Sequence, residues 1–449
     1  MNRRWLTDGV ASLRGVVVLT AALAAPRLVA AAEITDVADA ADTIRIGNLQ
    51  RDDPFDFYLG AEFENDLGTG KITREPIDRP GISPDDPNAC TERNPRDCRP
   101  VDELTFRRVT NRLNVSGQIG IFHDLALSFG WHMVVSDSIK FAFADGVSGA
   151  NSTVAPDTGT TLFSIPHSYY HRGSGAFDLG LKWAPLSDER DESKPSWVLY
   201  FNWSSPLVAT TYNPAVDDAT ISHPATAGDG VHRLTGGMAL SKRIVNFGLI
   251  GIDPNLPRRG YIDPYIDLSY TLPVPQRGRA LAENLPASNF GSPPSHEARC
   301  NAGFEIVPVE NLKNGYKLAV DLGLRSTYYS QGRNYSELTD ALKELTYTDQ
   351  YMFVGGTLGL YAQIAHFLRL KASFVAGYNT AHFLTNENVG NDVDGDNQVL
   401  AATDNINPYF CGNTDGDACP VDSYDQVGFR FRADRHLQLK FMLNMMFTF

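Results

Sequence analysis

Residues 435–449 read RHLQLKFMLNMMFTF, and this stretch decides the fold of the chain. Every odd position from 437 onward is apolar, whereas Gln438, Lys440 and Asn444 lie among the residues between them. A repeat of two residues is the geometry of a β-strand, because successive side chains point to opposite faces. One face of this strand is wholly apolar and the other is polar, which predicts lipid on one side and a polar lumen on the other.

The same alternation returns along the chain and predicts an all-β, antiparallel transmembrane barrel of twelve strands. The long connections are expected outside the cell, at 66–103, 139–172, 205–230, 273–302, 329–347 and 384–434. The others are mostly shorter and are expected in the periplasm, near 122–124, 185–195, 244–262, 311–314 and 364–367. The eighth strand, near 304–310, contains Pro308, which removes a donor from the ladder. Counts of ten and fourteen strands therefore stay open.

The last residue, Phe449, lies at the end of the apolar face and resembles the C-terminal signature of bacterial outer-membrane barrels. The segments 180–186 (GLKWAPL) and 240–243 (LSKR) resemble parts of outer-membrane transporter-like channels, and the likeness extends over most of 50–449. The resemblance implies a porin-like or transporter-like barrel in the outer membrane of a Gram-negative bacterium. It also implies that Phe449 is an assembly signal for the barrel-assembly machinery. It implies no substrate.

The N-terminal residues have the pattern of an export signal. Arg3 and Arg4 precede an apolar stretch at 15–25, which is too short to span a bilayer, and three alanines at 30–32 suit signal peptidase. The expected divisions are a signal peptide at 1–32, a periplasmic leader at 33–54 and the barrel at 55–449. The leader is too short for a folded plug domain, which disfavours an energy-driven receptor.

Residues that alternate with the apolar positions are expected to face the lumen. The charged ones are Asp56, Glu62, Arg108, Arg112, Asp178, Lys182, Arg233, Asp267, Lys317, Asp321, Arg325, Arg369, Lys371 and Lys440. Nine of them are basic and five acidic, although the whole chain carries a net charge of −14. Charges that line a water-filled pore set its ion preference, so this set predicts passive passage of small polar or anionic solutes. The alternative is that the charges pair across the wall and fill the lumen.

Residues 331–346 look locally helical and are expected to pack over the mouth.

Two of the long loops carry residues with a predicted role. The pairs Cys90 with Cys98 and Cys411 with Cys419 are each eight positions apart, which predicts two local disulfides in an oxidising compartment. Cys300 is left over, either free or exchanged with one of these four. The carboxylates of a candidate calcium site are Asp392, Asp394 and Asp396. A solvated loop, or cation bridges to lipopolysaccharide, are the alternatives, and no other cofactor is expected.

Composition and motifs exclude several classes of function. The negative net charge leaves no basic face for nucleic acid, and 43% apolar residues come without any apolar run of membrane-helix length. His167, Ser168 and His171 are the nearest approach to a catalytic set, but adjacent strand residues point to opposite sides. A non-conducting barrel whose loops bind a partner is the main alternative to a channel, and a lipid-modifying enzyme is a weaker one. Outer-membrane lipid and lipopolysaccharide are the expected surroundings, and oligomerisation stays open.

Overall fold

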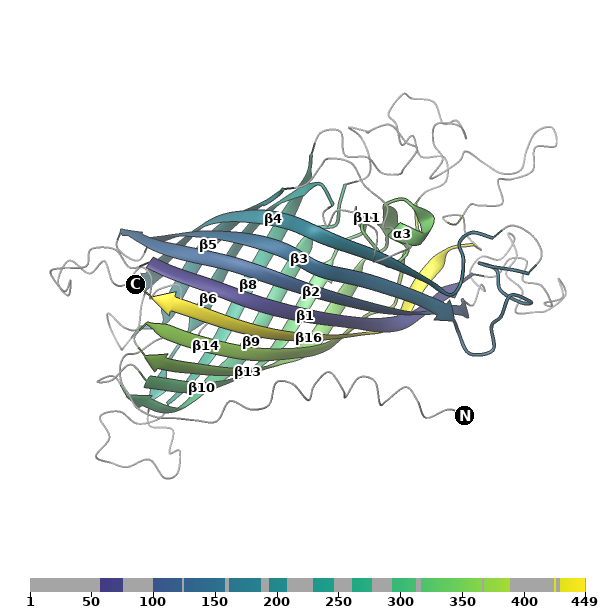
Figure 1. Ribbon diagram of the computed structural model, residues 1–449. Coiled ribbons are helices and arrows are strands. Elements are labelled where there is room, and N and C mark those ends of the chain that lie inside the picture. Colours follow the sequence, from purple (N-terminus) through teal and green to yellow (C-terminus); the bar gives the residue numbers. More distant parts are fainter. Residues whose placement is uncertain are drawn as a thin grey trace.

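The computed structural model describes residues 57–75, 100–122, 125–157, 161–186, 194–207, 229–245, 261–276, 293–311, 316–365, 367–387, 424 and 429–448. Twelve long antiparallel strands form one closed barrel (Figure 1). They are β1 (Phe57–Arg74), β2 (Val101–Phe122), β3 (Leu125–Phe143), β4 (His167–Leu186), β5 (Ser196–Pro206), β6 (Val231–Ser241), β8 (Tyr261–Pro275), β9 (Glu297–Asn311), β10 (Tyr316–Tyr329), β13 (Tyr351–Ala365), β14 (Leu368–Asn379) and β16 (Phe431–Thr448). Each pairs with its neighbours in sequence, and β16 pairs with β1 to close the sheet. The predicted fold class and the count of twelve are confirmed.

The doubtful eighth strand is present as β9, and Pro308 lies in a β-bulge within it. Val309 pairs with Leu318 of β10 and Ile306 pairs with Val320. Two residues of β9, Val307 and Pro308, therefore lie opposite a single residue of β10. A bulge leaves one residue out of the ladder, so the missing N–H of proline costs the closed sheet no hydrogen bond.

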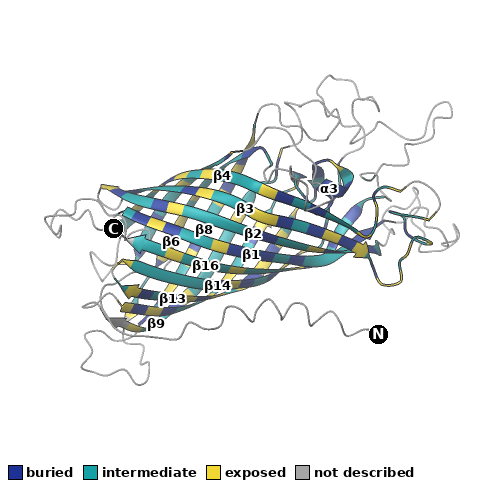
Figure 2. Ribbon diagram, viewed as in Figure 1, coloured by how far each residue is buried: buried dark blue, intermediate teal, exposed yellow. Residues whose placement is uncertain are grey.

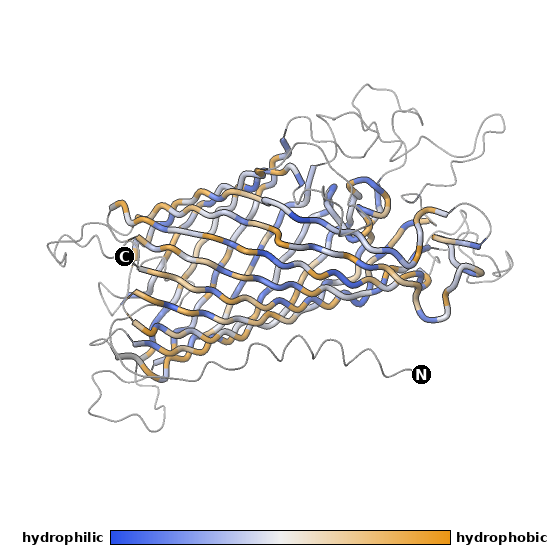
Figure 3. The backbone as a smooth tube through the Cα atoms, viewed as in Figure 1, coloured by the Kyte–Doolittle hydropathy of each residue, from blue (hydrophilic) through white to orange (hydrophobic). Residues whose placement is uncertain are grey.

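The outer surface of the barrel is an apolar belt. Exposed and buried residues alternate along the strands in Figure 2, and apolar and polar residues alternate in Figure 3. Exposed apolar side chains come from every wall of the barrel, among them Leu59, Phe63, Trp131, Leu181, Phe201, Met238, Ile266, Phe304, Leu322, Leu358, Phe374 and Leu443. A closed sheet with an apolar exterior and polar side chains inside is the architecture of a transmembrane β-barrel.

Several strands are longer at one end than the sequence pattern predicts. β1 continues to Arg74, β2 begins at Val101 and β16 begins at Phe431, so the loops next to them are shorter than expected. At this end the inward residues become apolar, as Ile72 and Leu104 show. The connection between β2 and β3 is only two residues long and lies at the opposite end, where β16 also ends (Figure 1).

A hydrophobic core fills part of the barrel at this extended end. Five small elements accompany the barrel strands: β7 (Ile244–Val245), β11 (Gly332–Asn334), α3 (Thr339–Leu342), β12 (Thr346–Thr348) and β15 (His382–Phe383). β11 pairs only with β12, and α3 follows them at the mouth (Figure 1). The core consists of Ile72, Leu104, Phe106, Ile139, Phe141, Val154, Phe163, Tyr169, Leu338, Ala341, Leu384, Phe431 and Ala433. Of the segment expected to be helical, only the four residues of α3 are so. Within the described part of the chain, no helix is long and apolar enough to cross a membrane.

Candidate functional site

Residues 331–350, called the mouth plug below, are held inside the extended end of the barrel by apolar contacts. Leu338 is fully buried and Ala341 is nearly so, and both belong to the core that β1, β2, β3 and β16 also supply. Leu345 is likewise 1% exposed. Burying a leucine side chain contributes roughly 1.5–3 kcal/mol. The plug is therefore a packed part of the barrel rather than a loop that lies over it.

Polar contacts fix the same segment to the wall. The Tyr335 hydroxyl donates to the Asp340 carboxylate and also contacts Nε2 of His171 on β4. Nε2 of His171 lies 2.9 Å from Oδ1 of Asp340. Arg333 and Glu387 form an ion pair with both side chains buried. Undocking the plug would separate these partners, and a buried charge left without its partner is unfavourable. The contacts therefore hold the plug in one position.

A cavity of about 720 Å³ lies in the lumen beneath the plug. Tyr335 of the plug lines it, and the remaining lining residues come from β1, β2, β3, β4, β5, β6, β9 and β16 and from Asp229, just before β6. A cavity of this volume is within the range that takes small ligands. Five of the predicted lumen residues line it, namely Glu62, Arg108, Arg112, Arg233 and Lys440.

Acidic neighbours neutralise the cations on the β1–β3 and β16 side of this cavity. Arg108 donates two hydrogen bonds to Asp137, of 3.0 and 2.6 Å. The Glu64 carboxylate accepts from Arg112 and, at 2.9 Å, from Lys440. Bidentate and shared pairs of this kind compensate charge locally. This side of the lumen therefore presents little net charge.

The opposite wall carries two guanidinium groups without such close acids. Arg299 of β9 lies opposite Thr327 of β10, and Arg325 lies opposite Asn301, so the two arginines are diagonal neighbours on one face. The nearest carboxylate to Arg299 is that of Glu297, at 3.7 Å, and the buried Nε of Arg299 has no hydrogen-bond partner. Arg325 forms no ion pair within 4 Å among the described residues. Positive charge without a close carboxylate thus lies at Arg299 and Arg325, on the inward face of β9 and β10.

The predicted lumen residues that the structure describes all lie on the inward face of their strands: Glu62, Arg108, Arg112, Asp178, Lys182, Arg233, Asp267, Lys317, Asp321, Arg325, Arg369, Lys371 and Lys440. They are not gathered at one site. Asp178 contacts His132 at 2.7 Å, and Asp267 and Asp321 accept hydrogen bonds from the hydroxyls of Tyr200 and Tyr265. Lys317 is buried 2.9 Å from Glu305, well away from the mouth cavity.

The inner wall carries more acidic residues than predicted. The additional inward acids on the strands are Glu64, Asp66, Asp137, Asp263, Glu297 and Glu305. Asp66 and Glu297, like Arg299, were missed because the strands were predicted to be too short at one end. Continuing the period-two pattern through the polar ends of β1 and β9 would have found them.

Several predicted sites lie outside the described residues. These are the four loop cysteines Cys90, Cys98, Cys411 and Cys419, the calcium candidates Asp392, Asp394 and Asp396, the assembly residue Phe449, the predicted lumen residue Asp56 and the signal peptide at 1–32. They stay predictions. Cys300 is a free thiol. No group of three metal-binding side chains occurs in the part of the chain that the structure covers.

Comparison with known proteins finds similarity of fold only. No protein-family model and no curated protein matches the chain. The transport unit of the autotransporter AIDA-I from Escherichia coli matches at 8% identity and a TM-score of 0.38, covering 93% of this chain and 97% of that one. An outer membrane channel from Pseudomonas putida F1 matches at 9% identity and a TM-score of 0.35, covering 87% of this chain and 96% of that one. A FadL homologue from Pseudomonas aeruginosa matches at 8% identity and a TM-score of 0.32, covering 88% of this chain and 90% of that one.

The closed sheet and its apolar exterior settle where the protein resides. A β-barrel with a lipid-facing belt is the form in which a sheet spans a membrane, because closure leaves no unpaired strand edge. The chain is an outer-membrane β-barrel.

Proposed function

We propose that this barrel is a gated channel for passive passage of small polar or anionic solutes. The observation that carries the proposal is a polar lumen cavity of about 720 Å³ whose lining on one side includes Arg299. Arg299 and its neighbour Arg325 attract anions because no carboxylate compensates them at hydrogen-bond distance. The paired cations on the facing wall keep the lumen hydrated without adding to ion preference.

The mouth plug is the gate in this proposal. It fills part of the lumen above the cavity through a compact contact with the wall. Local segments open with free energies below that of global unfolding, so a docked plug can leave a barrel that stays folded. The docked plug corresponds to the closed channel.

Recordings in a planar bilayer test the proposal. The wild-type protein is expected to show stepwise conductance with a reversal potential that favours anions in a salt gradient. The double variant Arg299→Gln with Arg325→Gln is expected to conduct with that preference reduced or lost. The matched control, Arg112→Gln with Glu64→Gln, removes one cation and one anion from the facing wall, so its preference should stay that of the wild type.

Two outcomes count against a channel of this kind. Cation preference in the wild type, or unchanged preference in the Arg299 and Arg325 variant, would contradict the assignment of the selective wall. Silence at every potential, in the wild type and in a variant whose plug is loosened, would favour a non-conducting barrel whose loops bind a partner. Lipid hydrolysis by the purified protein would favour the enzyme alternative.

A further inference from the structure

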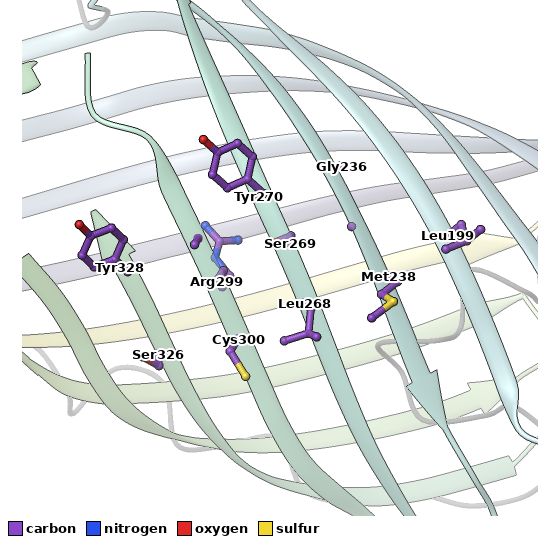
Figure 4. Close-up of a pocket in the computed structure, with 12 residues that line it drawn as sticks. Leu199, Gly236, Met238, Leu268, Ser269, Tyr270, Arg299, Cys300, Ser326 and Tyr328 are labelled. Carbon is purple, nitrogen blue, oxygen red and sulfur yellow. The ribbon is translucent and has the colours of Figure 1, made fainter. Parts of the chain in front are cut away.

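A second hollow, of about 680 Å³, lies on the lipid-facing side of the wall (Figure 4). Its centre is β9, where Ala298 and Cys300 point outward, and Arg299 between them points into the lumen. Larger side chains of the neighbouring strands border it, with Leu268 and Tyr270 on β8 and Tyr328 on β10. We refer to this hollow as the β9 groove.

The strand register explains why a groove forms here. One row across the sheet contains, in order, Gly236, Tyr270, Ala298 and Tyr328, because each is paired with the next. Large and small residues thus alternate, and the tyrosine rings stand on either side of Ala298. A Cβ atom built on Gly236 would meet no heavy atom within 4 Å, which confirms open space beside Tyr270.

The groove is large enough for a segment of a hydrocarbon chain. Its volume is about 680 Å³, and its two outward residues on β9, Ala298 and Cys300, lie about 7 Å apart along the strand at ~3.4 Å per residue. The side chains that border the groove at its inner end, Met238 and Leu268, are apolar. An apolar recess of this volume that opens toward the membrane can seat a segment of one acyl chain.

Polar groups lie at the outer end of the groove, on the side of the long loops. The Tyr270 hydroxyl is 2.7 Å from Nδ1 of His296, and the Tyr328 hydroxyl donates to Gln350 at 2.8 Å. Aromatic residues with polar tips occur where a barrel crosses the membrane interface. The rim therefore lies at the level of lipid headgroups in the outer leaflet.

We propose that the β9 groove binds one acyl chain of an outer-leaflet lipid, with the lipid headgroup against His296 and Tyr270. The belt around the groove is the surface that faces the membrane, so hydrocarbon chains are what contacts it. A chain seated between the tyrosines fills a recess that bulk lipid would leave poorly packed, and packing of this kind supplies affinity within a bilayer. The proposal does not depend on conduction.

Lipid retention measured by native mass spectrometry tests it. The purified barrel is incubated in detergent with phosphatidylglycerol, which stands in for the outer-leaflet lipid as a source of acyl chains with an anionic headgroup, and the lipids that stay bound per barrel are counted. The variant Gly236→Leu with Ala298→Leu fills the groove and is expected to lose most of the bound lipid. Its control, Gly356→Leu with Ala372→Leu, adds the same groups to outward positions of β13 and β14 outside the groove, where a Cβ on Gly356 meets nothing closer than 3.9 Å.

Retention of one lipid by the wild type and the control, but not by the filled variant, supports the groove. Equal lipid retention by all three proteins overturns the proposal. The proposal is also overturned if the wild-type barrel forms a dimer and filling the groove abolishes that dimer. The variant His296→Ala tests the rim separately, and it should weaken retention of phosphatidylglycerol. Heat-modifiable migration of each variant on a gel shows that the barrel has folded.

Cys300 supplies an independent readout in the unaltered protein. Its thiol lies in the groove and is partly exposed. Phosphatidylglycerol is expected to slow its reaction with an apolar maleimide in the wild type and to have little effect in the filled variant. Lack of protection in the wild type would contradict a seated acyl chain.

Discussion

Truncation of Leu338 should open the channel by loosening the mouth plug. Leu338 is 0% exposed and packs into the core formed by residues such as Ile72, Leu104 and Phe431. Leu338→Ala removes three carbon atoms, worth about 2.4 kcal/mol at roughly 0.8 kcal/mol per buried CH₂ group. The cavity left behind raises this to about 3 kcal/mol.

That loss falls on the docking of the plug, because the barrel ladder does not involve Leu338. At about 1.4 kcal/mol per tenfold change, ~3 kcal/mol raises the ratio of undocked to docked plug roughly 150-fold. Open probability in bilayer recordings should rise by a similar factor until it approaches saturation. Heat-modifiable migration should stay that of the wild type.

The control for this variant is Leu324→Ala, which removes the same atoms from the lipid-facing surface. Leu324 is 72% exposed, so its truncation leaves no cavity in the plug core. If the Leu338→Ala protein folds and its open probability equals that of the wild type, the reasoning is refuted. An equal rise in both variants would show that the effect has nothing to do with the plug.

Two further predictions concern the plug and the belt. Burial alone would raise the pKa of Glu337, but His436, 3.7 Å away, helps to hold it below its ordinary value of 4.5. The ionised Glu337 therefore stabilises the docked plug above pH 4.5, and this stabilisation is lost as the pH falls further. The open probability of the wild type should rise in acid, and that of Glu337→Gln should rise less. For the belt, Leu358→Arg puts a charge on the lipid face at a cost of ~2–4 kcal/mol and should reduce the heat-modifiable protein, whereas Thr357→Arg, inside the lumen, should assemble.

The barrel was predictable because its strands are amphipathic over the membrane. Lipid on one side and water on the other impose the same alternation on every strand, so local sequence carries the information. The pattern failed at the extended end for a physical reason. There Ile72, Leu104 and Phe106 face inward against the plug core, which reverses the apolar face, and the strands were predicted to end early.

The plug could not be predicted from local sequence to the same degree. Its contacts join residues far apart in the chain, such as Tyr335 with His171 and Arg333 with Glu387. Only four of its residues are helical, so helical periodicity is a weak guide to it. Its burial depends on inward residues of several strands that no single stretch of sequence contains.

The lumen shows why a list of charges is a poor guide to ion selectivity. Arg112 was a natural candidate for setting anion preference, but Glu64 beside it compensates its charge. Replacing Arg112 with Glu would put two carboxylates side by side, so any change in ion preference would mix repulsion with lost attraction. Arg325 has no acid within ion-pairing distance among the described residues, and removing its charge changes the field in the lumen directly. Ion preference should therefore follow the charges of Arg299 and Arg325 more closely than the total charge of the inner wall.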